Sequence, residues 1–181
     1  MTRYITAPWR AAYVRTSSSR KGCVFCRVLK SSDDSTNGVL FRGRFNFIVL
    51  NRYPYNPGHL MVAPNRHLAD LAGLRPAEAG EFIKLIQTSL KVLSRAYRPQ
   101  GFNIGLNIGR DAGAGVVGHV HAHIVPRWAG DANFMPLFSR TRVFIEGLEE
   151  TYGRLRPRFE KAAARRRRQR SGRASGRKIS R

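Results

Sequence analysis

The sequence contains only two cysteines among its 181 residues, Cys23 and Cys26. It also has no run of 18 apolar residues, so we expect no transmembrane helix and no membrane partner. The N-terminus lacks the apolar stretch and small-residue cleavage site of a signal peptide, which favours a cytoplasmic location. A chain of this length can bury a sizeable core as one domain without disulfide bonds.

Acidic residues are scarce, with 11 Asp and Glu against 33 Lys and Arg, for a formal net charge of +22. Residues 154–181 contain thirteen of the cations and a single acid, Glu160, and so contribute +12 of that charge. An arginine run at 165–170 and a Ser/Gly/Arg end show no apolar periodicity, so residues 159–181 are expected to form a disordered basic tail. Such a tail can contact nucleic-acid phosphates without sequence preference, or serve only as a solubilising end.

Short strand-like segments dominate the middle of the chain, with one long helical pattern between them. Apolar residues recur every three or four positions from Pro76 to the residues before Pro99, which predicts a helix of about five turns. A second helix is expected from about Thr141 to Arg158. The hairpin-length connections imply antiparallel pairing, so we predict an α+β fold with a five-stranded antiparallel sheet, one long packed helix and a C-terminal helix. The expected strands lie at 39–41, 45–50, 60–63, 102–108 and 118–126.

The two cysteines form a CxxC motif, Cys23-Val24-Phe25-Cys26. In a reducing compartment this spacing indicates a metal clip or a redox pair more often than a structural disulfide. A thioredoxin-like pair follows a buried strand, whereas a polar segment, residues 17–22, precedes this one. Zinc is therefore the favoured interpretation, and it requires two further ligands.

Three of the five histidines, His119, His121 and His123, occupy alternate positions in one short run. In an extended strand alternate side chains share a face, so the three imidazoles are expected in a row on one side of the sheet. Imidazole can attack phosphorus, donate to phosphate oxygens and coordinate zinc near neutral pH. The alternatives are incidental metal binding and histidines paired in the core.

Several motifs occur with these histidines in a fixed order along the chain. Pro57-Gly58-His59 precedes the long helix, a glycine-bearing loop at 109–115 precedes the histidine run, and Pro126-Arg127-Trp128 closes it. With the CxxC motif, they give a chain that resembles the histidine triad (HIT) family of nucleotide-binding enzymes over roughly residues 5–158. Residues 7–13 and 127–134 are similar to its bacterial branch of diadenosine tetraphosphate phosphorylases.

This resemblance implies an enzyme that cleaves adenine dinucleoside polyphosphates through a nucleotidyl-histidine intermediate, with phosphorolysis favoured over hydrolysis. His121 matches the nucleophile. The residues that match nucleotide-binding or phosphate-binding positions are Asn51, His59, Asn107 and His123. The alternative is a basic, nucleic-acid-associated HIT protein that senses nucleotides or removes adenylate from nucleic-acid ends. The implied organisation is an N-terminal extension (1–22) packing on the domain, a HIT domain (23–158) and the basic tail (159–181).

Some members of the family hold a structural zinc ion, and no organic cofactor is implied. The positions that match the zinc ligands are Cys23, Cys26, His67 and His119, a closed set of two thiolates and two imidazoles. The family commonly forms homodimers through the long helix and a sheet edge. Many members carry a glutamine and a hydroxyl residue before the first histidine of the triad, where this chain has Gly115 and Val116. Arg110, another Lys or Arg, or backbone amides would then hold the leaving phosphate.

Overall fold

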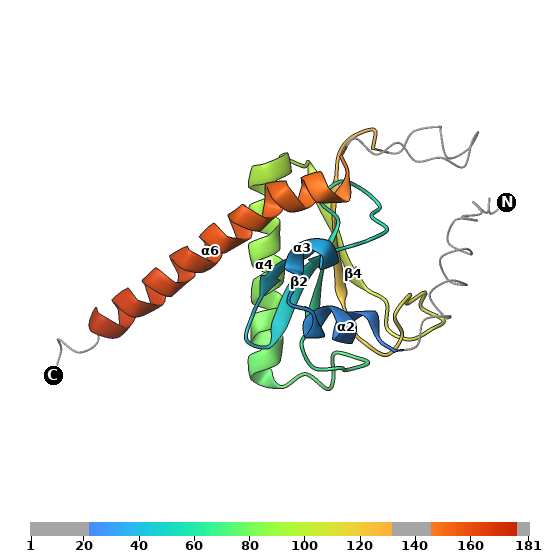
Figure 1. Ribbon diagram of the computed structural model, residues 1–181, viewed down its shortest axis with the longest axis horizontal. Helices are drawn as coiled ribbons and strands as arrows, with labels where there is room; N and C mark the ends of the chain where they lie inside the picture. Colours follow the sequence, from blue (N-terminus) through green and yellow to red (C-terminus); the bar gives the residue numbers. More distant parts are fainter. Residues whose placement is uncertain (1–21, 132–145, 177–181) are drawn as a thin grey trace.

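The computed structural model describes residues 22–131 and 146–176 (Figure 1). One antiparallel sheet with the strand order β1-β2-β3-β5-β4 forms its centre, which confirms the predicted α+β class. The strands are β1 (Val39–Arg42), β2 (Asn46–Leu50), β3 (Leu60–Pro64), β4 (Gly101–Leu106) and β5 (Ala122–Arg127). The helices are α2 (Val24–Lys30), α3 (Asp34–Asn37), α4 (Pro76–Tyr97) and α6 (Leu148–Gly176). The expected N-terminal extension lies almost wholly outside the described residues.

The two faces of the sheet carry separate apolar clusters because neighbouring residues on a strand point to opposite sides. Helices α4 and α6 cover one face, where Ile48, Val62, Ala122 and Ile124 join the larger cluster. Helix α2 covers the other face, where Phe25 packs with a smaller cluster. That cluster also contains Val28, Val39, Phe47, Val49, Met61 and Ala63. His121 and His123 alternate with Ala122 and Ile124, so they point to the α2 face.

Helix α4 begins and ends where the sequence predicts. Pro76 needs no N–H partner in the first turn, and the Glu78 carboxylate accepts a hydrogen bond from the Arg75 N–H at 2.9 Å. At the other end Arg98 adopts a left-handed conformation with φ 48°, directly before Pro99. The C-terminal part of α4 packs close to Gly58, where an added Cβ would lie 2.9 Å from the Tyr97 ring. Glycine at this position therefore lets the loop before His59 approach the helix.

The segment between the cysteines and β1 is more ordered than its composition indicates. The predicted loop at 31–38 contains the short helix α3, because the Asp33 carboxylate caps it by accepting from the Thr36 N–H at 3.0 Å. The Arg42 guanidinium donates to three carbonyl oxygens at the end of α2, those of Val28, Leu29 and Ser31, at 2.7–3.2 Å. Arg42 therefore fixes α2, with its cysteines, against the sheet.

The histidine strand begins later than the alternating pattern predicts. Strand β5 starts at Ala122, so among the three histidines only His123 lies within it. The Val120 N–H instead donates to the Leu68 carbonyl at 2.7 Å, which ties the preceding segment to the loop after β3. This loop contact replaces strand pairing and brings His119 close to His67.

The C-terminal helix continues beyond Arg158, where the sequence analysis ended it. Residues Thr151, Leu155 and Phe159 form a buried stripe at intervals of four, and Ala162 packs beside it. Because alanine and arginine also favour helix, α6 runs on to Gly176, so the expected irregular tail is helical to that point. The expected start near Thr141 lies outside the described residues. No helix in the described ranges is long and apolar enough to cross a membrane.

Candidate functional site

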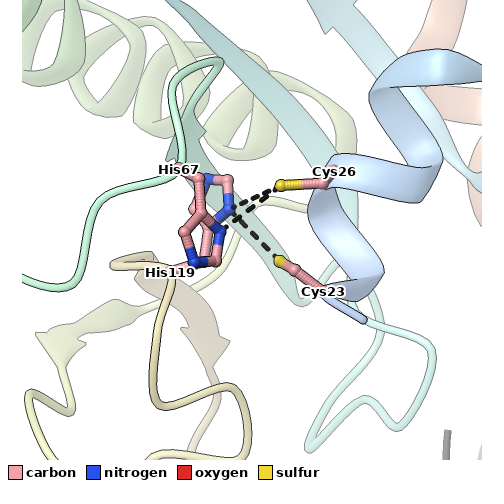
Figure 2. Close-up of side chains that lie close together, drawn as sticks. All are labelled: Cys23, Cys26, His67 and His119. Carbon is pink, nitrogen blue, oxygen red and sulfur yellow. Dashed lines mark hydrogen bonds between the residues drawn. The ribbon is translucent and has the colours of Figure 1, made fainter. Parts of the chain in front are cut away.

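Four potential metal ligands from three segments, Cys23, Cys26, His67 and His119, meet at the first histidine of the run (Figure 2). The Cys23 Sγ lies 3.3 Å from the His119 Nδ1, and the Cys26 Sγ lies 3.7 Å from the same atom. The Cys26 Sγ is also 3.4 Å from the His67 Nδ1, and all four ligand atoms lie within 4.8 Å of one another. Tetrahedral zinc with ordinary Zn–S and Zn–N bonds separates sulfur from nitrogen by about 3.6 Å. The cluster therefore has the size and donor set of a closed zinc site.

The surrounding residues orient the His119 and His67 rings for this role. The His119 Nε2 lies 2.8 Å from the Pro64 carbonyl oxygen. Because a carbonyl only accepts, Nε2 carries the proton, and the lone pair of Nδ1 points at the cysteines, as in metal-bound histidines. Burial lowers the pKa of His119 and keeps this ring neutral. Gly118 leaves room for His67, since a Cβ at Gly118 would lie 3.3 Å from the His67 Nε2.

His121 is held in one tautomer by the main chain. Its Nδ1 lies 2.8 Å from the carbonyl oxygen of His119, so Nδ1 carries the proton and Nε2 keeps its lone pair. Its ring centroid is 4.9 Å from that of Phe25 and 4.8 Å from that of His123. Burial lowers the pKa of His121, so the neutral imidazole predominates at pH 7. A neutral ring with a free Nε2 lone pair can act as a nucleophile.

His59 and His123 form the other half of the site. The Tyr55 N–H donates to the His59 Nδ1 at 3.0 Å, so a neutral His59 carries its proton on Nε2. That proton points to the His123 Nδ1 at 3.0 Å, which leaves the proton of a neutral His123 on its Nε2. The pKa of His59 is lowered to about 3, mainly by burial and to a smaller extent by the nearby His123 and His121. The site therefore combines a lone pair on His121 with an N–H donor on His123.

The two asparagines expected at the site lie at its edges. The Asn51 Oδ1 accepts from the Tyr53 N–H at 2.9 Å, and its Nδ2 lies 3.3 Å from the His59 Nε2. Asn107 follows Leu106, which pairs with Ala122, so Asn107 continues the register beside His121. Its Nδ2 donates to the Gly113 carbonyl at 3.3 Å, which holds the glycine-bearing loop. The structure thus brings His59, His121, His123 and both asparagines into one region.

The structure also gives roles to residues for which the sequence predicts none. Phe25, inside the CxxC motif, packs its ring against both His119 and His121. The Tyr55 main-chain amide sets the His59 tautomer, a role for which a sequence carries no signal. Asp131 lies within the 127–134 similarity, yet its contacts with Arg127 and Asn56 become visible only in the fold.

The lowered pKa of His59 predicts a loss of stability in acid. The folded protein holds this imidazole neutral down to pH of about 3, whereas the unfolded chain binds a proton below about 6.5. Protonation of the unfolded state therefore lowers the free energy of unfolding as the pH falls below 6.5, by about 2 kcal/mol at pH 5. Urea unfolding of the wild type and of His59→Gln at pH 7 and pH 5 measures this effect.

The comparison with His59→Gln isolates His59 because the other four histidines are present in both proteins. We expect the wild type to lose more stability than the variant between pH 7 and pH 5. Equal losses in the two proteins would show that His59 is not held neutral by the fold.

Comparison with known proteins identifies relatives of this chain. A family model described as HIT domain matches residues 35–130. An AP-4-A phosphorylase of Mycobacterium tuberculosis is 41% identical over 135 residues, which cover 75% of this chain and 69% of the relative. An asymmetrical bis(5'-nucleosyl)-tetraphosphatase of Schizosaccharomyces pombe is 32% identical over 117 residues, 65% of this chain and 60% of that protein.

Solved structures show the same fold. A Zn-bound histidine triad family protein from Mycobacterium smegmatis superimposes with a TM-score of 0.62 at 27% sequence identity. The match covers 82% of this chain and 98% of that protein. The resemblance inferred from the CxxC, Pro57-Gly58-His59 and histidine-run motifs is therefore confirmed.

Proposed function

Because the chain belongs to the HIT domain family, we propose that it is a nucleotide phosphorylase or hydrolase that cleaves adenine dinucleoside polyphosphates. The observation that carries this proposal is the pairing of the His121 Nε2 lone pair with the N–H donor of His123, fixed by separate hydrogen bonds. The M. tuberculosis relative is named a phosphorylase, which favours phosphorolysis over hydrolysis.

The reaction proceeds in two displacements. The His121 Nε2 attacks the α-phosphorus, the bond to the bridging oxygen breaks, and its electron pair leaves with the rest of the polyphosphate. With diadenosine tetraphosphate, ATP departs and adenylate remains on His121. An oxygen of inorganic phosphate then attacks this adenylate and releases ADP, whereas attack by water releases AMP. The His123 Nε2–H donates to the phosphoryl oxygens, and one such preorganised donor contributes about 3 kcal/mol.

The remaining site residues position the substrate. We assign ribose contact to Asn51 and support of the phosphate side to Asn107 and the loop at 109–115. His59 orients His123 through their shared hydrogen bond. Val116 packs against the apolar cluster around Phe25 and offers the leaving phosphate no polar contact. The exposed Arg110, another Lys or Arg, or backbone amides would then hold this phosphate.

Zinc fits the Cys23, Cys26, His67 and His119 cluster by donor type, by spacing and by the orientation of His119. The M. smegmatis histidine triad protein is zinc-bound, which favours zinc as the metal. When bound, the metal supplies cross-linking of α2 to the loops that carry the two histidines. Its role is structural, because four protein ligands leave no position for substrate.

The products formed with and without phosphate test the activity. With diadenosine tetraphosphate and inorganic phosphate we expect ADP and ATP in equal amounts, because phosphate takes the adenylate from His121. With phosphate omitted, AMP and ATP should form more slowly. Chromatography of the nucleotides distinguishes the two routes. AMP as the main product in saturating phosphate would make the enzyme a hydrolase, and no turnover in either buffer would refute the proposed function.

We further propose a cytoplasmic homodimer. Strand β4 is the last strand of the sheet, and its Ile104 side chain is 46% exposed. Ile108, just beyond the strand, is 45% exposed. Pairing of two β4 edges would cover both side chains and satisfy the outer main-chain groups. Sedimentation of the full chain tests this assembly.

A second function, contact with nucleic acid, is favoured by the position of α6. Its buried stripe ends near Ala162, and Figure 1 shows the following part of the helix projecting past α4. This part begins the arginine-rich sequence of residues 165–181, which contains no acid. Helix α6 packs on the α4 face, whereas His121 and His123 point to the α2 face. A polyanion on this helix would therefore leave the site free.

Truncation after Ala164 separates the two functions while keeping Phe159 in the core. RNA affinity should fall strongly at low salt, and turnover of the free dinucleotide should stay within twofold of wild type. Each phosphate that the shortened chain no longer neutralises should flatten the slope of log affinity against log salt by about 0.7 to 0.9. A full-length variant with glutamines at 165–168 controls for helix length. Unchanged RNA affinity would show that residues 165–181 are an inert end.

A further inference from the structure

We propose that Asp131 is a positioning residue that fixes His59, and through it His123, by holding Asn56. Asp131 lies in the turn after β5, and none of its hydrogen bonds in the described chain involves a histidine. The inference rests on the proposed function for its kinetic consequence, but its geometric part concerns the histidine rings alone. Four hydrogen bonds converge on the Asp131 carboxylate from three different residues.

The carboxylate is fully committed to this turn and to the neighbouring loop. The Asp131 Oδ2 accepts from the Arg127 Nε at 2.6 Å, from the Asn56 Nδ2 at 2.8 Å and from the Trp128 N–H at 3.3 Å. Its Oδ1 accepts from the second guanidinium nitrogen of Arg127 at 2.7 Å. The hydrogen bonds from Arg127 lower the pKa of Asp131, so the carboxylate stays ionised at neutral pH. Its side chain is only 12% exposed.

Asn56 carries this constraint into the loop before His59. Its amide group has two protons, one of which goes to Asp131 and the other to the Pro126 carbonyl oxygen at 2.8 Å. The main-chain carbonyl oxygen of Asn56 in turn accepts from the His59 main-chain N–H at 3.1 Å, which closes the turn between them. The loop is therefore tied at Asn56 to the end of β5.

The neighbouring residue transmits the position to the site. The Tyr55 N–H, next to Asn56, donates to the His59 Nδ1 at 3.0 Å, and the Tyr55 ring stacks on the His59 ring with centroids 5.0 Å apart. This amide fixes the His59 tautomer, which directs the Nε2 proton to His123. Displacement of the loop would release the amide, and both rings would then sample the other tautomer.

The carboxylate is the acceptor that Asn56 and Arg127 share. Asparagine could keep the Asn56 contact by placing its own oxygen at the Oδ2 position, and it would then lose only the second Arg127 bond. Asp131→Ala instead removes the acceptors for Asn56 and Arg127 together. Because the Arg127 side chain is 45% exposed and can bond to water, the fold should survive the change.

The test combines nitrogen NMR of histidine-labelled protein with kinetics. The wild type should show protonated Nε2 and unprotonated Nδ1 for both His59 and His123. In Asp131→Ala a second tautomer should appear for both rings, and kcat should fall by about tenfold to a hundredfold, as expected for a misplaced catalytic group. KM should change by less than threefold.

Two further variants make the result specific. Asn56→Leu removes the same contact from the other side, and the double variant should be no worse than Asn56→Leu alone, because both act through one contact. Glu160→Gln serves as the control. It breaks the Arg156–Glu160 ion pair, which has the same four-residue spacing as Arg127–Asp131 but lies on α6. This control should leave the histidine signals and kcat unchanged.

Wild-type tautomer signals in Asp131→Ala, or additive losses in the double variant, would overturn the proposal. A wild-type protein without turnover would refute the proposed function instead, and the nitrogen signals would still decide the role of Asp131.

Discussion

Replacing His121 by alanine should reduce turnover of diadenosine tetraphosphate at least a thousandfold while the protein still binds nucleotide. The change removes the Nε2 lone pair, which the hydrogen bond from Nδ1 to the His119 carbonyl keeps unprotonated. Loss of an attacking group ordinarily costs several powers of ten in kcat. Quenched-flow assays of the wild type should also trap one adenylate per site, and the variant should trap none.

His123→Ala provides the matched comparison, since it removes a neighbouring imidazole that donates a hydrogen bond but does not attack. We expect a smaller loss of about a hundredfold to a thousandfold, the range found when one donor to a developing charge is removed. Thermal melts of both variants check that each retains the fold. A His121→Ala enzyme within tenfold of the wild type would rule out covalent catalysis by this residue.

Removal of the metal should cause the largest loss of stability. Untagged protein should contain one zinc ion per chain, and Cys26→Ser should lose it, because serine is a poor ligand at neutral pH. A closed zinc site binds the native state and scarcely exists in the unfolded chain, so its loss should lower the melting temperature by more than about 10 °C. Elemental analysis and calorimetry measure the two effects.

His123→Ala again serves as a control, because it alters a histidine of the same run without touching the metal cluster. It should keep zinc and lose far less melting temperature than Cys26→Ser does, because it removes only the hydrogen bond from His59. Protein that contains no metal, with both thiols freely titratable and an unchanged melting temperature in Cys26→Ser, would contradict the zinc assignment.

The elements of the fold that the sequence predicted well are those with strong local periodicity. The sequence itself shows the apolar stripe of α4, its initial Pro76 and the Pro99 that follows its end. The predicted start of β5 was wrong because the Val120 N–H donates to the carbonyl of Leu68, a loop residue whose position follows only from the tertiary structure. The predicted end of α6 was wrong because the high charge of residues 159–181 indicated a disordered tail. The burial of Phe159, which continues the helix, depends on its packing against the sheet.

In the candidate site, too, local sequence patterns were predictable and tertiary contacts were not. The histidine alternation and the CxxC motif indicate chemistry directly, whereas pairing His67 with Cys26, 41 residues earlier, required a family resemblance. The tautomers were beyond prediction, because carbonyl oxygens of Pro64 and His119 and the Tyr55 amide set them. Main-chain groups are present at every position, so the sequence does not mark the ones that matter.

His119 connects the two halves of this region in a way that neither half shows alone. Its imidazole belongs to the metal cluster, while its carbonyl oxygen orients the His121 ring. A metal ion bound to the His119 imidazole would therefore also hold the His119 carbonyl oxygen that orients His121, without touching substrate. Removal of the ion would let this carbonyl oxygen move, so activity should decline before the domain unfolds.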